Sequence, residues 1–367
     1  MCNGTIMDKL ISFSLPLMLS GILQLMFNAV DIIVVGRFSG SQALAAVGST
    51  SALINVFTNL FIGISLGANV LTARFYAAGR EKEVSETVHT AITLALVSGI
   101  VMALVGLVFS RGALALMGTP DDVIGLSALY MRIYFLGMPF FMLYNYGAAI
   151  LRAVGDTKRP LLFLMIAGVI NACLNMVLVI VFKLGVAGVA IATVMAETVS
   201  AFLACMTLTR TDGAHKLVLR DLHINKTCLG EIFRIGLPAG VQQGLTAFSN
   251  ALVQAYINGL GSSVIMAGWS CHSKIDQFAI LPAQSMGQAA TTFVGQNLGA
   301  KNVKRARDGV KQAVFMGVGV LICISGAMAI SARSLVSLFN QDPDVLHYGT
   351  LFILMTVPFR FCSSFNQ

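Results

Sequence analysis

The sequence predicts an all-α membrane protein made of two parallel-repeat helix bundles. Hydrophobic residues make up 56% of the 367 residues and charged residues only 11%, whereas a soluble protein carries about 25% charge to cover its surface. Ten apolar runs are each long enough, at roughly 20 residues, to cross a bilayer as a helix. Several short sequence matches recur about 220 residues apart. Lipid is therefore the expected solvent for most of the chain.

The ten predicted spans set the organisation of the chain. They cover residues 10–35, 44–72, 88–109, 126–150, 160–182, 186–208, 230–258, 263–288, 310–332 and 345–367. The connections are short except for residues 209–229, which hold several charged side chains. We therefore predict an N-lobe of six spans at 1–208, a cytoplasmic linker at 209–229 and a C-lobe of four spans at 230–367.

Basic residues indicate the orientation. Of the 24 Lys and Arg, 17 lie in breaks on one side of the predicted spans and four on the other. Because cytoplasmic loops of membrane proteins carry the excess of Lys and Arg, we expect the N-terminus and the linker in the cytoplasm. The net charge of +8 has the same explanation, since these residues lie between apolar runs and not along one amphipathic face. No nucleic-acid partner is predicted.

The sequence matches relate the two bundles to each other. Leu15-Pro16 recurs as Leu237-Pro238, Ser65-Leu66-Gly67 as Ser285-Met286-Gly287, Asp122-Val123 as Asp344-Val345, and Pro139-Phe140 as Pro358-Phe359. Six spans, an even number, separate equivalent points, so the repeats run parallel, and two such bundles facing a cleft are the plan of a transporter. At this offset the C-lobe is expected to lack its last two helices. Whether the gene product is truncated or the sequence is incomplete stays open.

Polar side chains inside spans mark packing contacts or a transport pathway, because an unpaired polar group in hydrocarbon is costly. Asp31 lies deep in the first span, Asn171 and Asn175 are one helical turn apart in the fifth, and Thr193 lies in the sixth. One carboxylate, two amides and a hydroxyl form an all-oxygen set that suits a hard cation such as Na⁺. Asp31 could instead take a proton. Asn171 or Thr193 alone could equally be a packing contact between helices.

Other polar residues leave their roles open. Glu197 is expected nearer a helix end, from which its carboxylate can reach the membrane surface. Lys274 and Asp276 lie two residues apart in the eighth span and point to different faces, so each needs a partner elsewhere. Pro16 either starts the first helix or kinks it. No ATP-binding or hydrolase motif is present, so we predict no enzyme and no cofactor other than a coupling ion.

The chain resembles the multidrug and toxic compound extrusion (MATE) family of cation-coupled exporters. The resemblance rests on Val30 to Arg37, Leu151 to Pro160, Asn171 to Asn175, Gly236 to Pro238 and Gln288 to Gly299. It covers essentially the whole chain. The family's fold implies two six-helix lobes that alternate between outward and inward openings.

The resemblance also implies roles for individual residues. The family's N-lobe cation site falls on Asp31, Asn171, Asn175 and Thr193. Na⁺ or proton binding there would expel the drug, Pro16 would let the first helix bend, and Gln24 and Asn145 would contact the drug. Two carboxylates that many members carry in the C-lobe are absent here, since Thr246 and the stretch from Phe361 to Ser364 occupy those places. Coupling is therefore expected to depend on Asp31.

The predicted function is export of organic, cationic and amphipathic drugs or toxins by a monomer, in exchange for Na⁺ or H⁺. The expected location is the inner membrane of a bacterium, with the lipid bilayer as the other partner. One alternative is a lipid-linked oligosaccharide flippase of the same superfamily, which would need a basic cleft for pyrophosphate. The other is a membrane scaffold or receptor that transports nothing. Neither the choice between Na⁺ and H⁺ nor the drug follows from the sequence.

Overall fold

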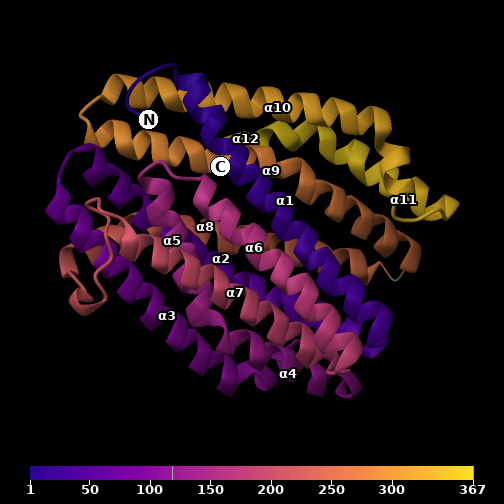
Figure 1. The fold of residues 1–367 in the computed structure, drawn as a ribbon. Coiled ribbons are helices and arrows are strands. Elements are labelled where there is room, and N and C mark those ends of the chain that lie inside the picture. Colours follow the sequence, from indigo (N-terminus) through magenta and orange to yellow (C-terminus); the bar gives the residue numbers. More distant parts are fainter. Residues whose placement is uncertain (118, 261, 367) are drawn as a thin grey trace. The chain divides into compact units, whose positions relative to one another are not determined.

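Helices make up the fold in the computed structural model, which describes residues 1–117, 119–260 and 262–366 (Figure 1). The α-helices are α1 (Ile6–Phe38), α2 (Ser41–Ala77), α3 (Glu81–Leu116), α4 (Asp121–Leu136), α5 (Met138–Ala153), α6 (Lys158–Asn175), α7 (Gly185–Arg210), α8 (Lys226–Gly259), α9 (Ser263–Gly299), α10 (Val303–Ser337), α11 (Pro343–Thr356) and α12 (Ser363–Asn366). A π-helix, η1 (Met176–Val181), follows α6, and the short 3₁₀ helices η2 (Leu219–Asp221) and η3 (Val357–Cys362) precede α8 and α12. The predicted all-α fold class is confirmed.

Local signals explain where the helices begin and end. At the N-termini of α9, α10 and α11 the side chains of Ser262, Asn302 and Asp342 accept hydrogen bonds from backbone N–H groups of the first turn, which have no partner within the helix. After α2 and α5 the chain reverses at Gly79 and Gly155, with φ of 69° and 102°. Glycine adopts this left-handed conformation without steric cost.

Most of the helices have the length and apolarity needed to cross a membrane. Seven candidate spans lie in the described residues, and α4 with α5 forms an eighth that bends by 46° at Gly137. Helices α8 and α9 occupy the positions of the predicted seventh and eighth spans, with 34 and 37 residues, but they fall short of the same apolarity. Polar side chains such as Gln243 and Asn250 in α8 and Lys274 in α9 account for the difference. The chain is a multi-pass membrane protein.

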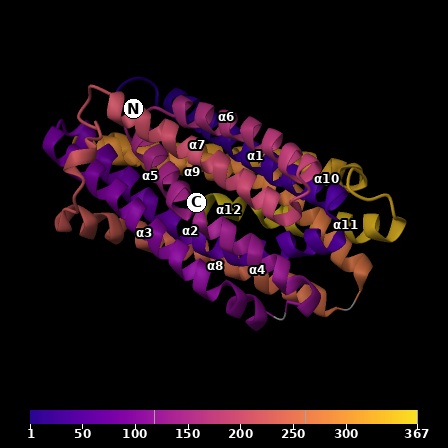
Figure 2. The same cartoon turned by 60° about the horizontal axis from the view of Figure 1, so that its bottom comes forward.

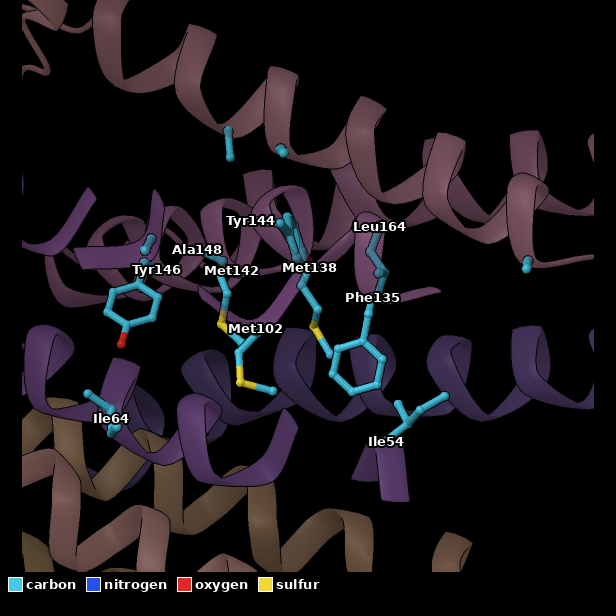
Figure 3. Close-up of a cluster of buried hydrophobic side chains, with 14 of the residues drawn as sticks. Ile54, Ile64, Met102, Phe135, Met138, Met142, Tyr144, Tyr146, Ala148 and Leu164 are labelled. Carbon is cyan, nitrogen blue, oxygen red and sulfur yellow. The ribbon is translucent and has the colours of Figure 1, made fainter. Parts of the chain in front are cut away.

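Residues Leu23–Ala247 form one compact unit, here called unit 2. Its core joins α2, α3, α4, α5, α6 and α7, and Figure 3 shows buried side chains of Ile54, Met102, Phe135 and Met142 meeting inside it. Helices α6 and α7 run side by side in both views (Figures 1 and 2). This burial of large apolar side chains stabilises the unit and fixes the helices that carry the polar residues.

Residues Met1–Ile22 and Phe248–Gln367 form a second compact unit, unit 1. The first half of α1 packs on α9 and α10 through Leu10, Phe13, Met286 and Phe293. A separate cluster joins α9, α10 and α11. Packing thus divides both α1 and α8, since their first and second halves belong to different units. The predicted lobes 1–208 and 230–367 were defined by the sequence repeat and not by packing. Their boundaries therefore differ from those of the two units and stay a prediction.

The first half of α8 belongs to unit 2 because it lies directly on α2. A Cβ atom added to Gly236 would lie 2.6 Å from the carbonyl oxygen of Ile64 and 2.7 Å from its Cα. Gly67 and Gly63 make similarly close approaches from the α2 side, to Ile232 and Gly240. Glycines on both helices therefore allow backbone to touch backbone, as in the small-residue contacts common between membrane helices.

The linker is also held on unit 2, where it packs against the start of α3. The backbone N–H of Val218 donates to Nε2 of His89 at 3.1 Å, and that of Asn225 donates to Oγ1 of Thr90 at 3.0 Å. Oε2 of Glu86 accepts from Nδ2 of Asn225 at 2.7 Å and lies 3.1 Å from Nε2 of His223. The segment that joins α7 to α8 is therefore held against α3 by hydrogen bonds.

Candidate cation site

Four side chains predicted from the sequence meet inside unit 2. Asp31 comes from the second half of α1, Asn171 and Asn175 from α6, and Thr193 from α7. Nδ2 of Asn175 donates to one carboxylate oxygen of Asp31 and to Oδ1 of Asn171, the latter at 3.0 Å. Oγ1 of Thr193 lies 3.3 Å from the other carboxylate oxygen of Asp31 and accepts from Nδ2 of Asn171 at 3.4 Å. The predicted constellation is present as one hydrogen-bonded cluster.

A glycine on α6 sets the register that brings Asp31 to the asparagines. Gly168 leaves a space that the ring of Phe27 fills, and a Cβ atom there would overlap that ring. Phe27 lies one helical turn before Asp31, and Gly168 one turn before Asn171, so the same faces of the two helices carry both contacts. The apolar contact thus positions the polar one.

The cluster offers more acceptors than donors. Asp31 is 8%, Asn171 5% and Asn175 0% exposed. Oδ1 of Asn175 is buried, and no described group donates a hydrogen bond to it. A buried acceptor without a donor is costly, and a buried carboxylate without a counter-charge is costlier still. No ion pair among the described residues involves Asp31, so the site fits a small positive species.

The chain changes its helical pitch directly beside the site. The π-helix η1 begins at Met176, the residue after Asn175. Wider turns of this type inside α-helices are rare and occur often at functional sites. Here the change follows the last residue of the cluster, so the amides of α6 keep regular α-helical spacing up to Asn175.

Two tyrosines beside the site were not predicted. Tyr130 and Tyr134 lie one turn apart on α4, with ring centroids 6.2 Å apart, and both lie within electrostatic range of Asp31. Their spacing was visible in the sequence, but phenols in an apolar run give no charge signal, and only the packing of α4 on α7 brings them to the site.

The remaining predicted residues lie elsewhere or have other partners. Gln24 is exposed on α1. Asn145 donates from Nδ2 to the carbonyl oxygen of Phe141 in its own helix at 2.8 Å. Their predicted contact with a drug stays a prediction, as does the bending role of Pro16, which lies inside the continuous helix α1.

Two open assignments gain a definite place. Glu197 lies at the middle of α7 and not near a helix end, so the expectation that it reaches the membrane surface is wrong. Asp276 pairs with the guanidinium of Arg360 in η3, whose side chain is 3% exposed. This is the partner that the sequence required for Asp276, and it lies in unit 1. Lys274 is exposed.

Comparisons with known proteins agree with this architecture. The MatE family profile matches residues 16–177 and 238–367. A probable multidrug resistance protein of Bacillus subtilis, YoeA, is 33% identical over 357 residues, covering 94% of this chain and 76% of the relative. The multidrug export protein MepA of Staphylococcus aureus is 24% identical over 361 residues, covering 97% and 78%. A multidrug resistance MATE family transporter solved in an outward-facing conformation superposes with a TM-score of 0.91 at 22% identity, covering 99% of this chain and 81% of that one.

Proposed function

Because the chain belongs to the MatE family, we propose that it exports organic cations in exchange for Na⁺ or H⁺ bound at Asp31. The relatives named above are transporters and not enzymes, in keeping with the absence of enzyme motifs. The proposed cycle alternates between outward and inward openings. The proposed setting is a monomer in the inner membrane of a bacterium, with its N-terminus in the cytoplasm.

The observation that carries this proposal is the cluster of Asp31, Asn171, Asn175 and Thr193. A carboxylate in a membrane-spanning helix is functional by default, since its cost must be balanced by a role. The orphan oxygen of Asn175 and the carboxylate together supply the oxygen ligands that a hard cation prefers. A proton on Asp31 would satisfy the same charge, so the geometry supports either coupling ion.

The same charge supports a cationic substrate. In the proposed exchange, the coupling ion and the cationic substrate compete for one negative charge. Binding of the coupling ion neutralises that charge and so releases the substrate. Asp31 can supply that charge, because no described basic side chain pairs with it. A flippase for a pyrophosphate-linked lipid would instead require basic residues at this place, so the site favours the exporter over that alternative.

The test is transport of ethidium, a fluorescent organic cation, into everted membrane vesicles. Either an imposed Na⁺ gradient or an imposed pH gradient should drive uptake, and Asp31→Asn should abolish it at unchanged protein level. Asp121→Asn is the matched control, because Asp121 is an exposed carboxylate at the start of α4 in the same unit.

Two results would contradict the proposal. Uptake that follows neither gradient would favour a scaffold or receptor. Full activity of the Asp31→Asn variant would remove Asp31 from the coupling mechanism.

A further inference from the structure

A second carboxylate in unit 2 has no part in the site described above. Glu197 lies at the middle of α7, one helical turn beyond Thr193, so the two side chains share a face of the helix. Its side chain is half-buried. A carboxylate at this depth in a span calls for an explanation by function.

The surroundings of Glu197 supply no counter-charge. The elements packed against α7 are α4, α5, α6, η1 and, less extensively, α2. From α4 and α5, Tyr134 and Tyr144 lie within electrostatic range of Glu197. The basic side chains of α2 and α4 are Arg74, which pairs with Glu231, and Arg132, which is exposed. On α5, Arg152 interacts with Tyr144 and donates from Nε to the carbonyl oxygen of Ala148 at 3.0 Å. On α6, Lys158 and Arg159 lie in the first turn, far along the helix from the level of Glu197.

No ion pair among the described residues includes Glu197. An ionised carboxylate here keeps the desolvation cost of its half-buried side chain, because no opposite charge among the described residues pairs with it. Protonation of the carboxylate removes that cost.

The groups around Glu197 and Asp31 distinguish which ion each carboxylate can bind. The cluster at Asp31 holds two amides and a hydroxyl beside the carboxylate, enough oxygen atoms for Na⁺ or for a proton. Among the described residues, by contrast, no amide or hydroxyl is hydrogen-bonded to Glu197. Because hard metal ions take several oxygen ligands, this carboxylate is suited to a proton alone.

We propose that Glu197 is a second coupling site, which loads one proton in each transport cycle in addition to the ion bound at Asp31. This inference rests on the proposed function. It predicts one more coupled proton for each exported cation than the cluster at Asp31 supplies.

The test measures stoichiometry and not rate. Purified protein is reconstituted in liposomes whose lumen is one pH unit more acidic than the bath, with equal Na⁺ on both sides and the membrane potential clamped at zero. The accumulation of ethidium is read when net flux has stopped. Each coupled proton multiplies the accumulation ratio about tenfold per pH unit.

Glu197→Gln should therefore lower the final accumulation about tenfold, whichever ion Asp31 carries, while Glu197→Asp and the control Asp121→Asn keep the wild-type ratio. Should Glu197→Gln fail to fold, Glu197→Met supplies a second neutral variant of similar length. A neutral variant that works more slowly but reaches the wild-type ratio would overturn the proposal, because a merely structural role changes rate and not stoichiometry. Wild-type liposomes that accumulate nothing under either a pH or a Na⁺ gradient would overturn the proposed function itself.

Discussion

The contact between α8 and α2 predicts opposite effects for two alanine substitutions on the same helix. Gly236 lies against the backbone of α2, and an added Cβ atom would come within 2.6 Å of the carbonyl oxygen of Ile64. An added Cβ atom at Gly244, two turns further along α8, would meet nothing within 4 Å. Replacing glycine by alanine inside a helix stabilises it by roughly 0.5–1 kcal/mol when space allows.

The magnitude follows from that distance. Ordinary contact begins near 3.4 Å, so in Gly236→Ala the two helices must separate by about 0.8 Å, and both neighbours are backbone atoms that cannot rotate away. Such overpacking costs about 1–3 kcal/mol, which exceeds the gain in helix propensity. We expect a net loss of about 1–2 kcal/mol for Gly236→Ala and a gain of about 0.5–1 kcal/mol for Gly244→Ala.

The assay is thermal unfolding of the purified protein in detergent, followed by the far-ultraviolet circular dichroism of its helices and by loss of monodisperse protein. For a unit of this length each kcal/mol shifts Tm by about 2–4 °C. Gly236→Ala should lower Tm by about 2–8 °C and Gly244→Ala should raise it by about 1–4 °C. Equal shifts of the same sign in the two variants would refute the claim that α8 lies backbone to backbone on α2.

Three further predictions concern other contacts. Gly168→Ala should displace Phe27 and with it Asp31, so the concentration of Na⁺ or H⁺ that gives half-maximal transport should rise about tenfold or more. Gly125→Ala is the control, because a Cβ atom there meets nothing within 4 Å, and it should leave that concentration unchanged. Asp276→Asn leaves the buried guanidinium of Arg360 without its partner and should lower the free energy of unfolding by about 1–3 kcal/mol. This is below the range for fully buried pairs because the Asp276 side chain is 38% exposed. The double variant Asp276→Leu with Arg360→Met should recover most of the lost Tm. The carbonyl oxygen of Asp221 and the carboxylate of Glu86 raise the pKa of His223, and the His89 ring stacks on it at 6.0 Å. Linker docking through His223 should therefore be strongest below about pH 6.5 and weaken as pH rises through the raised pKa. Hydrogen exchange should show this as a falling protection factor of the Asn225 amide, which donates to Oγ1 of Thr90. Protection that ignores pH, or a pH response that persists in His223→Gln, would contradict this.

The sequence was sufficient to predict that Asp31, Asn171, Asn175 and Thr193 meet, because these residues carry their signal locally. Asn171 and Asn175 are one turn apart in a single helix, and Asp31 is conspicuous as an acid within an apolar run. Glu197 was misplaced although the span was predicted well, since residue 197 is at the middle of both the predicted span 186–208 and α7 (Gly185–Arg210). The residues at the ends of α7, such as Lys183 and Gly185 in the left-handed region, agree with that prediction.

Other features depend on residues that are far apart in the chain. The approach of Gly236 to Ile64 joins positions 172 residues apart, and nothing in either segment alone indicates the other as its partner. The two tyrosines of α4 come within electrostatic range of Asp31 through the packing of the helices in unit 2. Composition and periodicity therefore predict helices and their polar faces, whereas close packing decides which faces meet.

Helix α1 connects Asp31 to residues outside the candidate site. Its second half carries Asp31 in unit 2, and its first half carries Pro16 in unit 1. Pro16 lacks the N–H that would donate to the preceding turn, so the helix is weakest there, and Ser20 donates from Oγ to the carbonyl oxygen of Pro16 at 2.9 Å. Helix α8 repeats this plan with Pro238 in its first half but has no acid in its second half. Under the proposed function, ion binding acts directly on α1 through Asp31, which makes α1 the helix expected to move first.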